Sequence, residues 1–397
     1  MLSNIQLFFK QNLIFLIFIF LTACMNSDKT VEDESGLSKK ITKDQLVFEG
    51  GDGTVKNPYK VKTAEQLFMV RNNLSAHYIQ VTDIDLNIPA YNSGVGWTPI
   101  GCIETPFEGS YNGGGFTISN LIINRPLEKH NGLFGFLVGA RIENLRLSNV
   151  LIWGGYKVGA ISGTAFKGTE IRRVIVDDAH LKVEERYAGG ILGSGDDVLI
   201  YQCAFQGSIE KGFYEDWNFI GGLSGSITSS TTNKGSFVIE SFADVTISSN
   251  THNLLGGLVG AMWFNATIEN CYSKGKMMVS GDYAGGIVGE LRLGAKPKCI
   301  VNTYTTMRIL AKTHNKEIHA FVGHNEGGIF KGNFYETGEL NYRYSDTLVD
   351  AKTVAQMKIQ TTFEAQGWDF DNIWAIDPNG KINDGYPYLK WFLDGTQ

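Results

Sequence analysis

The chain has 397 residues, of which 35 are basic and 41 acidic, and its formal net charge of −6 comes without a basic stripe. This balance argues against nucleic acid as a main partner. Glycine makes up roughly 12% of the chain (47 of 397 residues), against about 7% in average proteins, yet only 8 prolines accompany it, so the composition is not that of a low-complexity linker.

Residues 1–23 form a predicted signal peptide. Lys10 supplies a positive charge, and the apolar run over 13–21 is too short for a stable membrane span. Leu21-Thr22-Ala23-Cys24 resembles a bacterial lipobox. The resemblance implies that Cys24 carries the lipid anchor; the alternative is an ordinary secretory signal with a chance cysteine. Met25, rather than Asp, follows the cysteine, which favours the outer membrane.

Residues 24–45 are polar and lack aromatic residues, which is typical of a flexible tether. The segment 46–131 is expected to hold an amino-terminal cap and the first coils of the fold. Within it, Thr63 and Gln66 form a helix start signal followed by apolar residues at helical spacing. A helix there suits the cap that an array of repeats needs over its end.

Short glycine blocks recur over residues 132–335. Their final glycines are Gly135, Gly163, Gly193, Gly225, Gly260, Gly289 and Gly323, which gives steps of 28, 30, 32, 35, 29 and 34 by subtraction. A period of about 30 residues indicates stacked structural units. Each block is followed by a second signal, such as Ile142-Glu143-Asn144-Leu145.

Between blocks, apolar residues alternate with a period of two, and the phase changes at Ile142 and Leu145, where a corner is expected. Short β-branched strands joined by corners predict an all-β fold, a right-handed parallel β-helix of about seven to nine coils. We expect the glycines to permit sharp bends. The six residues Leu133, Ile161, Ile191, Leu223, Leu258 and Ile287 are expected to stack inside.

Residues 336–397 are predicted to form a carboxy-terminal cap. The stretch 353–358 has the pattern of a short helix, and aromatic residues gather near the end of the chain. Large aromatic side chains are good lids for the apolar cross-section of a last coil.

The five cysteines show no zinc-type spacing. Cys203 and Cys271 hold equivalent positions two repeats apart, and stacked coils would place them roughly 10 Å apart, too far for a disulfide. We interpret both as small buried side chains.

The glycine blocks, Asp83–Leu86, Trp97–Gly101 and the final Tyr386-Pro387-Tyr388-Leu389 together resemble bacterial proteins that carry the GLUG repeat. The resemblance covers roughly residues 48–392 and implies an extracellular right-handed β-helix. Its members include surface lipoproteins, adhesin-like proteins and non-catalytic regions of large secreted metallopeptidases. It supplies no catalytic residues, and this chain has no H-E-x-x-H motif.

No catalytic, metal or cofactor site is predicted. Asp83 and Asp85 could serve a calcium-assisted lyase, but turn hydrogen bonds are the favoured interpretation. The pair Asp196-Asp197 is expected in a solvated turn. The seven histidines form no i, i+4 pair, although His314, His319 and His324 lie close in sequence.

Aromatic residues near the expected loops are the candidates for ligand binding, because an aromatic face can stack on a sugar ring. They are Trp153, Tyr214, Trp217 and Trp263, with corner packing as the alternative. Tyr187, Phe219 and Tyr283 precede their glycine pairs by two residues and share the phase of the buried block residue, so we expect them in the core.

The sequence therefore predicts a monomeric, surface-exposed outer-membrane lipoprotein without catalysis, which adheres to glycans or host or other extracellular proteins. One alternative is a polysaccharide-degrading lyase or hydrolase, for which clustered carboxylates and basic residues should line a groove across adjacent coils. The other is a passive spacer in a surface complex.

Overall fold

The computed structural model describes residues 31–32, 38–39, 47–212, 217–230, 234–249, 253–280, 283–292, 299–311, 317–337 and 349–394. The chain divides into two compact units, 1–46 and 47–397. In the first unit, β1 (Val31–Glu32) pairs antiparallel with β2 (Ser38–Lys39). The predicted signal peptide, Cys24 and most of the predicted tether lie outside the described residues.

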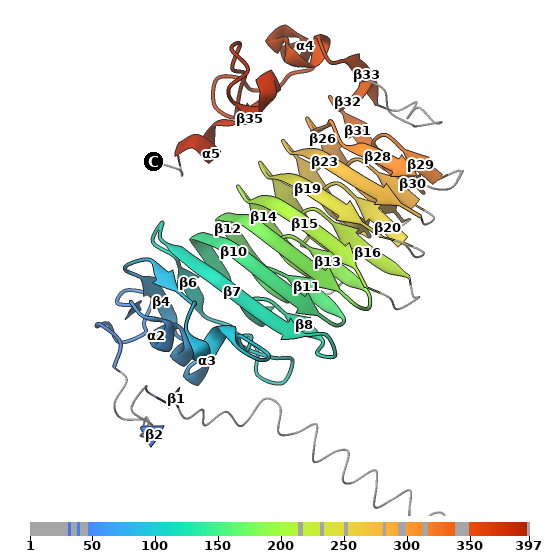
Figure 1. Cartoon of the computed structure of the whole chain (residues 1–397). Coiled ribbons are helices and arrows are strands. Elements are labelled where there is room, and N and C mark those ends of the chain that lie inside the picture. Colours follow the sequence, from blue (N-terminus) through green and yellow to red (C-terminus); the bar gives the residue numbers. More distant parts are fainter. Residues whose placement is uncertain are drawn as a thin grey trace, which may run out of the picture. The chain divides into compact units, whose positions relative to one another are not determined.

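The second unit is a parallel β-helix of about 8 turns, so the predicted fold class is confirmed. Figure 1 shows the strands stacked turn upon turn, from the blue amino-terminal elements to the orange last turns. Each full turn brings a strand beside the equivalent strand of the next turn in parallel, for example Tyr187 beside Phe219. Within the described residues the turns build one 24-stranded and one 7-stranded sheet.

Each turn contributes strands at recurring positions along the coil. The 7-stranded sheet contains β8 (His130–Asn131), β11 (Lys157–Gly159), β13 (Tyr187–Gly189), β16 (Asn218–Gly221), β20 (Asn253–Gly256), β24 (Tyr283–Gly285) and β29 (Glu317–His319). After the glycine blocks come β9 (Phe134–Val138), β12 (Ser162–Val183), β14 (Leu192–Tyr201), β17 (Ser224–Thr228), β21 (Val259–Met262), β25 (Val288–Leu291) and β30 (Val322–Asn325). The remaining coil strands are β6 (Ser110–Asn112), β7 (Thr117–Arg125), β10 (Arg141–Gly154), β15 (Ala204–Lys211), β18 (Ser236–Ile239), β19 (Phe242–Ser248), β22 (Ala266–Glu269), β23 (Tyr272–Val279), β26 (Cys299–Val301), β27 (Tyr304–Thr305), β28 (Arg308–Ala311), β31 (Ile329–Lys331) and β32 (Phe334–Thr337).

The predicted interior column is confirmed. Its residues are fully buried, and a backbone hydrogen bond joins each to the next turn, as from Ile161 N to Ile191 O at 3.1 Å and from Leu258 N to Ile287 O at 2.9 Å. Phe321 extends the column by one turn. Aliphatic side chains one repeat apart therefore share one continuous core.

The block glycines lie at bends, as predicted: Gly190, Gly222 and Gly257 each stand where the chain leaves a strand of the 7-stranded sheet for one of the 24-stranded sheet. Gly193, Gly225, Gly260 and their equivalents do not have positive φ. They are needed because the neighbouring backbone leaves no room. A Cβ at Gly225 would lie 2.6 Å from the carbonyl oxygens of both Gly193 and Phe219, a separation that no side chain tolerates.

A second set of corners is formed by non-glycine residues in the left-handed region. The expected break between Ile142 and Leu145 falls at Asn144, whose φ is +51°. The column continues through the following turns with Arg173, Gln202, Glu240, Asn270 and Asn302, all with positive φ. Asparagine is among the few non-glycine residues that adopt this conformation at low cost.

A polar ladder follows the later of these corners, from Gln202 onward, one rung per turn. Cys203 N donates to Ser241 Oγ (3.0 Å), Ser241 N to Cys271 Sγ (3.4 Å), and Cys271 N to Thr303 Oγ1 (3.3 Å). Thr303 N then donates to Asn333 Oδ1 (3.0 Å). Cys203 and Cys271 are buried and free, as predicted, but they act as polar rungs as well as small apolar side chains.

Helical and short strand elements cover the amino-terminal end. The predicted helix is confirmed as α2 (Ala64–Met69), whose N-cap Thr63 accepts from Gln66 N at 3.2 Å. It is accompanied by β3 (Tyr59–Val61), η1 (Val70–Asn72), β4 (His77–Gln80), β5 (Ile84–Asp85) and α3 (Pro89–Asn92). Leu67 and Val70 are fully buried and join the coil core.

The carboxy-terminal segment differs from the prediction. The stretch predicted as a helix, 353–358, is helical only in its second half, as the 3-10 helix η2 (Gln356–Lys358), because β33 (Asp350–Thr353) pairs with β32; α4 (Gln360–Glu364) follows. The rest comprises β34 (Trp374–Ala375), η3 (Asn383–Gly385), β35 (Tyr388–Leu389) and α5 (Lys390–Asp394).

The aromatic residues of this segment pack along the side of the coil, not only over its end. Ring stacking joins Phe242 to Tyr272 (4.6 Å between centroids) and Tyr272 to Tyr304 (5.2 Å), in an outward-facing column. Trp374 and Trp391 cover that column, and Trp391 Nε1 donates to Glu240 O at 2.7 Å, 151 residues earlier. We call residues 350–394 the strap.

No helix among the described residues combines the length and apolar character needed to cross a membrane.

Candidate ligand-binding flank

One side of the coil presents a flat surface that we call the flank. It consists of the outward side chains of β7, β10, β12, β15, β19, β23 and β28, which lie in register from turn to turn. One column contains Ile122, Leu151, His180, Ser208, Thr246, Lys276 and Arg308, and the other contains Asn124, Trp153, Lys182, Glu210, Ser248, Met278 and Leu310. Because the spacing of strands in a sheet is about 4.8 Å, each column offers one side chain at that interval.

Trp153 is the aromatic residue of the two flank columns. It is 39% exposed, and its Nε1 donates to Glu184 Oε1 at 2.6 Å. Lys182 Nζ lies 4.7 Å from its ring centroid, close enough for a cation–π contact. Glu184 is itself buried. The indole is therefore held in one orientation while part of it stays open to solvent.

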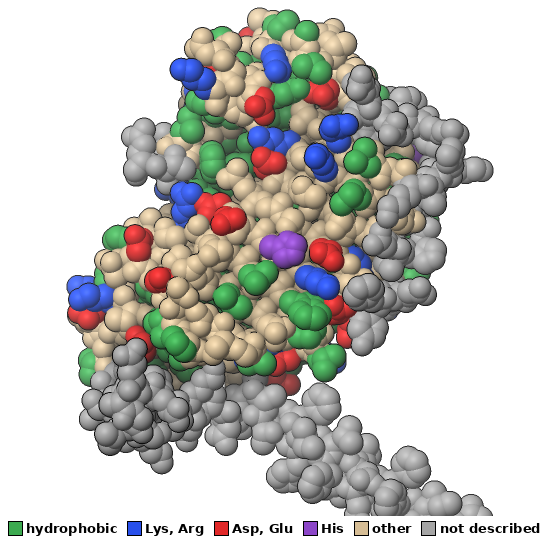
Figure 2. All heavy atoms as spheres, viewed as in Figure 1, with side chains coloured by type: hydrophobic (Ala, Val, Ile, Leu, Met, Phe, Trp, Pro, Cys, Tyr) green, Lys and Arg blue, Asp and Glu red, His purple; other side chains and the backbone are tan. Residues whose placement is uncertain are grey.

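Beyond Trp153 the flank changes character along the coil axis. Leu151, beside it, is 47% exposed. His180 Nδ1 lies 2.5 Å from Ser208 Oγ, and Nε2 lies 4.0 Å from Glu210. Ser208 and Thr246 then carry small hydroxyl groups in the same column. Figure 2 shows a face on which hydrophobic side chains, a histidine and scattered charges interrupt a largely uncharged surface.

The other predicted ligand residues lie elsewhere. Trp217 and Trp263 come together around the outward face of the 7-stranded sheet: Trp217 is 6.2 Å from the Tyr283 ring, and Trp263 is 5.3 Å from the Phe219 ring. Trp263 Nε1 also donates to the buried Glu290 at 3.4 Å. Tyr214 lies outside the described residues. The predicted residues therefore do not form one site.

The prediction that Tyr187, Phe219 and Tyr283 are core residues holds only for Phe219, which is buried in a cluster outside the coil interior; Tyr187 and Tyr283 are half-buried against that cluster. Their neighbours Ala188, Ile220 and Ala284 point inward and are fully buried. The inward and outward alternation of side chains is reset at the corner formed by each glycine pair. A residue an even number of positions before the buried Ile or Leu of the block therefore faces outward. Tyr187 and Phe219 stack on each other at 4.8 Å between centroids, and with Trp263 they form a separate apolar cluster.

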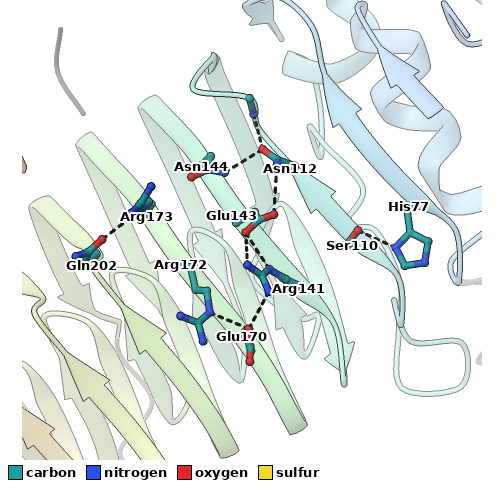
Figure 3. A network of polar contacts seen from close by, with 11 residues as sticks. His77, Ser110, Asn112, Arg141, Glu143, Asn144, Glu170, Arg172, Arg173 and Gln202 are labelled. Atoms are coloured by element: carbon teal, nitrogen blue, oxygen red, sulfur yellow. Dashed lines mark hydrogen bonds and ion pairs between the residues drawn. The ribbon is translucent and has the colours of Figure 1, made fainter. Parts of the chain in front are cut away.

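Carboxylates and basic residues, which an enzyme would need, do meet across two coils. They form a network in which each charge is already paired with an opposite charge (Figure 3). Arg141 bonds Glu143 at 2.7 Å and lies 3.5 Å from Glu170, and Arg172 bonds Glu170 at 2.8 Å. The Arg172 hydrogen bond is the main cause that lowers the pKa of Glu170. Glu143 also accepts from Asn112 at 3.2 Å. Because Glu170 stays ionised, it is not suited to be a general acid.

The two aspartate pairs have structural roles. Asp83 accepts from Thr117 N (2.8 Å), and Asp85 accepts from Asn120 Nδ2 (2.6 Å), a bond that is the main cause lowering the pKa of Asp85. The turn interpretation of this pair is confirmed. Asp196 and Asp197 are buried, not solvated as predicted: Asp196 accepts from Ser230 N at 2.8 Å, in the next turn.

The described residues hold no cluster of three or more His, Cys, Asp or Glu side chains that could bind a metal ion. His314 lies outside the described residues. His324 lies 3.3 Å from Glu317 and stacks on Tyr283 at 4.8 Å.

No protein-family model matches the chain. It is 27% identical, over 89% of its length, to a protein of Evansella cellulosilytica described as a Gly-rich membrane protein, and spans 47% of that protein. An immunoglobulin A1 protease of Streptococcus pneumoniae is 35% identical over 63% of this chain, which covers 13% of the protease. The chain thus spans about half or less of these curated relatives.

The fold has solved counterparts. A crystal structure described as an immunoglobulin A1 protease from Bacteroides ovatus matches 87% of this chain and 95% of its own, with a TM-score of 0.55 and 18% identity. Another structure, of an IgA1 protease, gives a TM-score of 0.57 at 19% identity, and the match covers 26% of that protein. At this identity the likeness establishes the β-helix fold alone.

Proposed function

We propose that this protein is a lipid-anchored, surface-exposed bacterial β-helix that binds glycans through its flank and has no catalytic activity. The observation that carries the proposal is Trp153, an exposed indole fixed by Glu184 and Lys182 on a flat, hydroxyl-bearing surface. A pre-ordered aromatic surface loses little conformational entropy on binding. The names of the relatives, a membrane protein and a halomucin that is 31% identical over 52% of the chain, are compatible with a surface location.

A glycan array probed with the protein from residue 25 onward tests the binding function. We expect Trp153→Ala to weaken binding to any glycan found by at least about tenfold, the effect of removing one aromatic anchor. Phe264→Ala is the matched control, because Phe264 is an aromatic residue of similar exposure (44%) outside the flank. Equal binding by both variants would remove the flank from the proposal.

Membrane attachment rests on Cys24. The proposed lipid would give stable anchoring because several acyl chains are buried together. Cys24→Ala should release the protein from the membrane fraction into the soluble fraction, whereas Cys299→Ala, the control, should leave it attached. Retention of the Cys24 variant would refute the anchor. We further interpret the glycine blocks as GLUG-type repeats.

Protease activity is the second candidate, because several curated relatives are named immunoglobulin A1 proteases. The match covers at most 13% of those relatives, and this chain lacks an H-E-x-x-H motif. We therefore interpret the shared part as a non-catalytic β-helix. Cleavage of immunoglobulin A1 by the purified protein, visible as new bands on a denaturing gel, would overturn that interpretation.

A further inference from the structure

Two basic side chains face each other at the far end of the flank from Trp153. Lys276 on β23 lies directly beside Arg308 on β28 in the parallel register, and both side chains point outward and are exposed. Among the described residues, neither has a carboxylate within ion-pair distance. The nearby acids are engaged elsewhere: Asp244 and the strap residue Asp384 both pair with Lys274, at 3.2 and 3.9 Å.

Like charges opposite each other in a sheet destabilise it. Elsewhere on the coil surface, charges in neighbouring turns are complementary, as with Arg141 beside Glu170 and Glu143 beside Arg172. The Lys276–Arg308 pair departs from this arrangement. An anionic group lying between the two side chains would bond both and relieve their repulsion.

The two ends of the flank lie on one line along the coil axis. From Trp153 to Leu310, which stands beside Arg308 in the second column, the register passes through five strand-to-strand steps, or roughly 24 Å at about 4.8 Å per step. Between the ends lie the hydroxyl groups of Ser208, Thr246 and Ser248. Glu210 and the exposed Met278 lie on the same line, so the surface is long and mixed, with an aromatic residue at one end and two cations at the other.

We propose that the ligand is a linear acidic polysaccharide, carboxylated or sulfated, which lies along the coil axis with one sugar on Trp153 and an anionic group between Lys276 and Arg308. Charge complementarity favours an anionic ligand, and the length and hydroxyl lining favour an extended sugar chain over a compact anion. This inference rests on the proposed glycan-binding function and specifies its ligand.

The test compares Lys276→Gln/Arg308→Gln with Lys60→Gln/Lys381→Gln, a control that removes the same charge from two exposed lysines outside the flank. Binding of immobilised heparin, polygalacturonate and neutral dextran is measured by surface plasmon resonance for the full folded unit. We expect the flank variant to bind one or both acidic polymers about fivefold to tenfold more weakly, as two exposed ionic contacts allow. The control should bind as the native protein does, and native binding should weaken when NaCl rises from about 0.05 to about 0.5 M.

Length provides a second readout. Acidic oligosaccharides long enough to span the roughly 24 Å should lose affinity in both Trp153→Ala and the double variant, whereas disaccharides should respond to one change only. Binding of dextran alone, unaffected by the double variant, would overturn the acidic ligand and leave glycan binding intact. Binding of no polysaccharide on the array or sensor would overturn both proposals. If the double variant loses more binding to phosphatidylglycerol vesicles than to polysaccharide, the two cations contact a membrane and the inference is overturned.

Discussion

The glycine that ends each repeat block is required by the space around it. At Gly225 an added Cβ would meet the oxygens of Gly193 and Phe219 at 2.6 Å and Ala188 N at 2.8 Å. All three are backbone atoms, which cannot turn aside as a flexible side chain can. The backbones of consecutive turns therefore approach each other as closely as glycine allows.

We expect Gly225→Ala to destabilise the protein by more than about 3 kcal/mol, because two turns must separate. Gly115→Ala is the control: its Cβ would meet nothing within 4 Å, although φ is +82°, so only the conformational cost of about 1–2 kcal/mol applies. Urea unfolding of both variants measures the difference. Equal midpoints would show that the block glycines serve conformation after all.

His130 makes stability depend on pH. Burial, followed by the charge of Lys157, lowers its pKa from 6.5 to about 4. The folded state thus holds the ring neutral at pH values where the unfolded chain protonates it. Its contribution is fully present above pH 6.5 and is lost as the pH falls towards 4, by up to about 3 kcal/mol. We expect His130→Gln to flatten the decrease in urea midpoint between these two values, and an unchanged decrease would contradict the assignment.

At the scale of elements, the corner ladder explains why small polar side chains recur beside the left-handed corner. Ser241 Oγ accepts from Cys203 N and donates to Ile239 O at 2.8 Å. Cys271 repeats the arrangement with Ser241 N and Glu269 O. Each rung satisfies backbone groups that the corner removes from the sheet.

Ser241→Ala should therefore cost about 1–3 kcal/mol, because it leaves the buried Cys203 N–H without an acceptor. Cys271→Ser is the matched control, since serine keeps an acceptor and a donor at an equivalent rung, and it should stay within about 1 kcal/mol of the native protein. Thermal unfolding and amide exchange at Cys203 report the two effects. If the Cys203 amide exchanges as slowly in Ser241→Ala as in the native protein, the ladder is not what satisfies it.

The elements show where sequence reasoning holds. The repeat period and the alternation predicted the parallel coil and its interior column, and the start signal at Thr63 and Gln66 predicted the amino-terminal helix. The phase argument failed at Tyr187, Phe219 and Tyr283, because it carried strand parity across a corner. The burial of Asp196 and Asp197 was missed since their partners, such as Ser230, lie one turn away. Pairing across turns is not visible in a local pattern.

At the scale of the whole molecule, the strap is the feature that the sequence repeat does not predict. Its aromatic residues were visible in the sequence, but the surface that receives them is assembled from Phe242, Tyr272 and Tyr304 of three separate turns. For the candidate site, the sequence singled out Trp153 correctly as an exposed aromatic residue. The Lys276–Arg308 pair could have been found only with the register known.

Trp374 tests the strap. It is fully buried, 4.5 Å from Trp368 between ring centroids, and Nε1 donates to Asn270 Oδ1 at 3.4 Å. Trp374→Ala should destabilise the docked strap by about 3–5 kcal/mol and make it susceptible to proteolysis while the coil remains folded. Ile359→Ala, at a strap position that is 50% exposed, should have little effect. Resistance of the Trp374 variant to trypsin would contradict the docking.

The bond from Trp391 to Glu240 also sets an order of events during synthesis. A chain synthesised from its amino terminus can add turns one by one upon the capped end, since each turn pairs with the one before it. The stacked rings of Phe242, Tyr272 and Tyr304, however, remain exposed to solvent until the strap has been synthesised and packs over them. A chain that ends before residue 350 would thus have a folded coil but an exposed hydrophobic surface along one side. Proteases that recognise exposed hydrophobic surfaces can degrade such a chain.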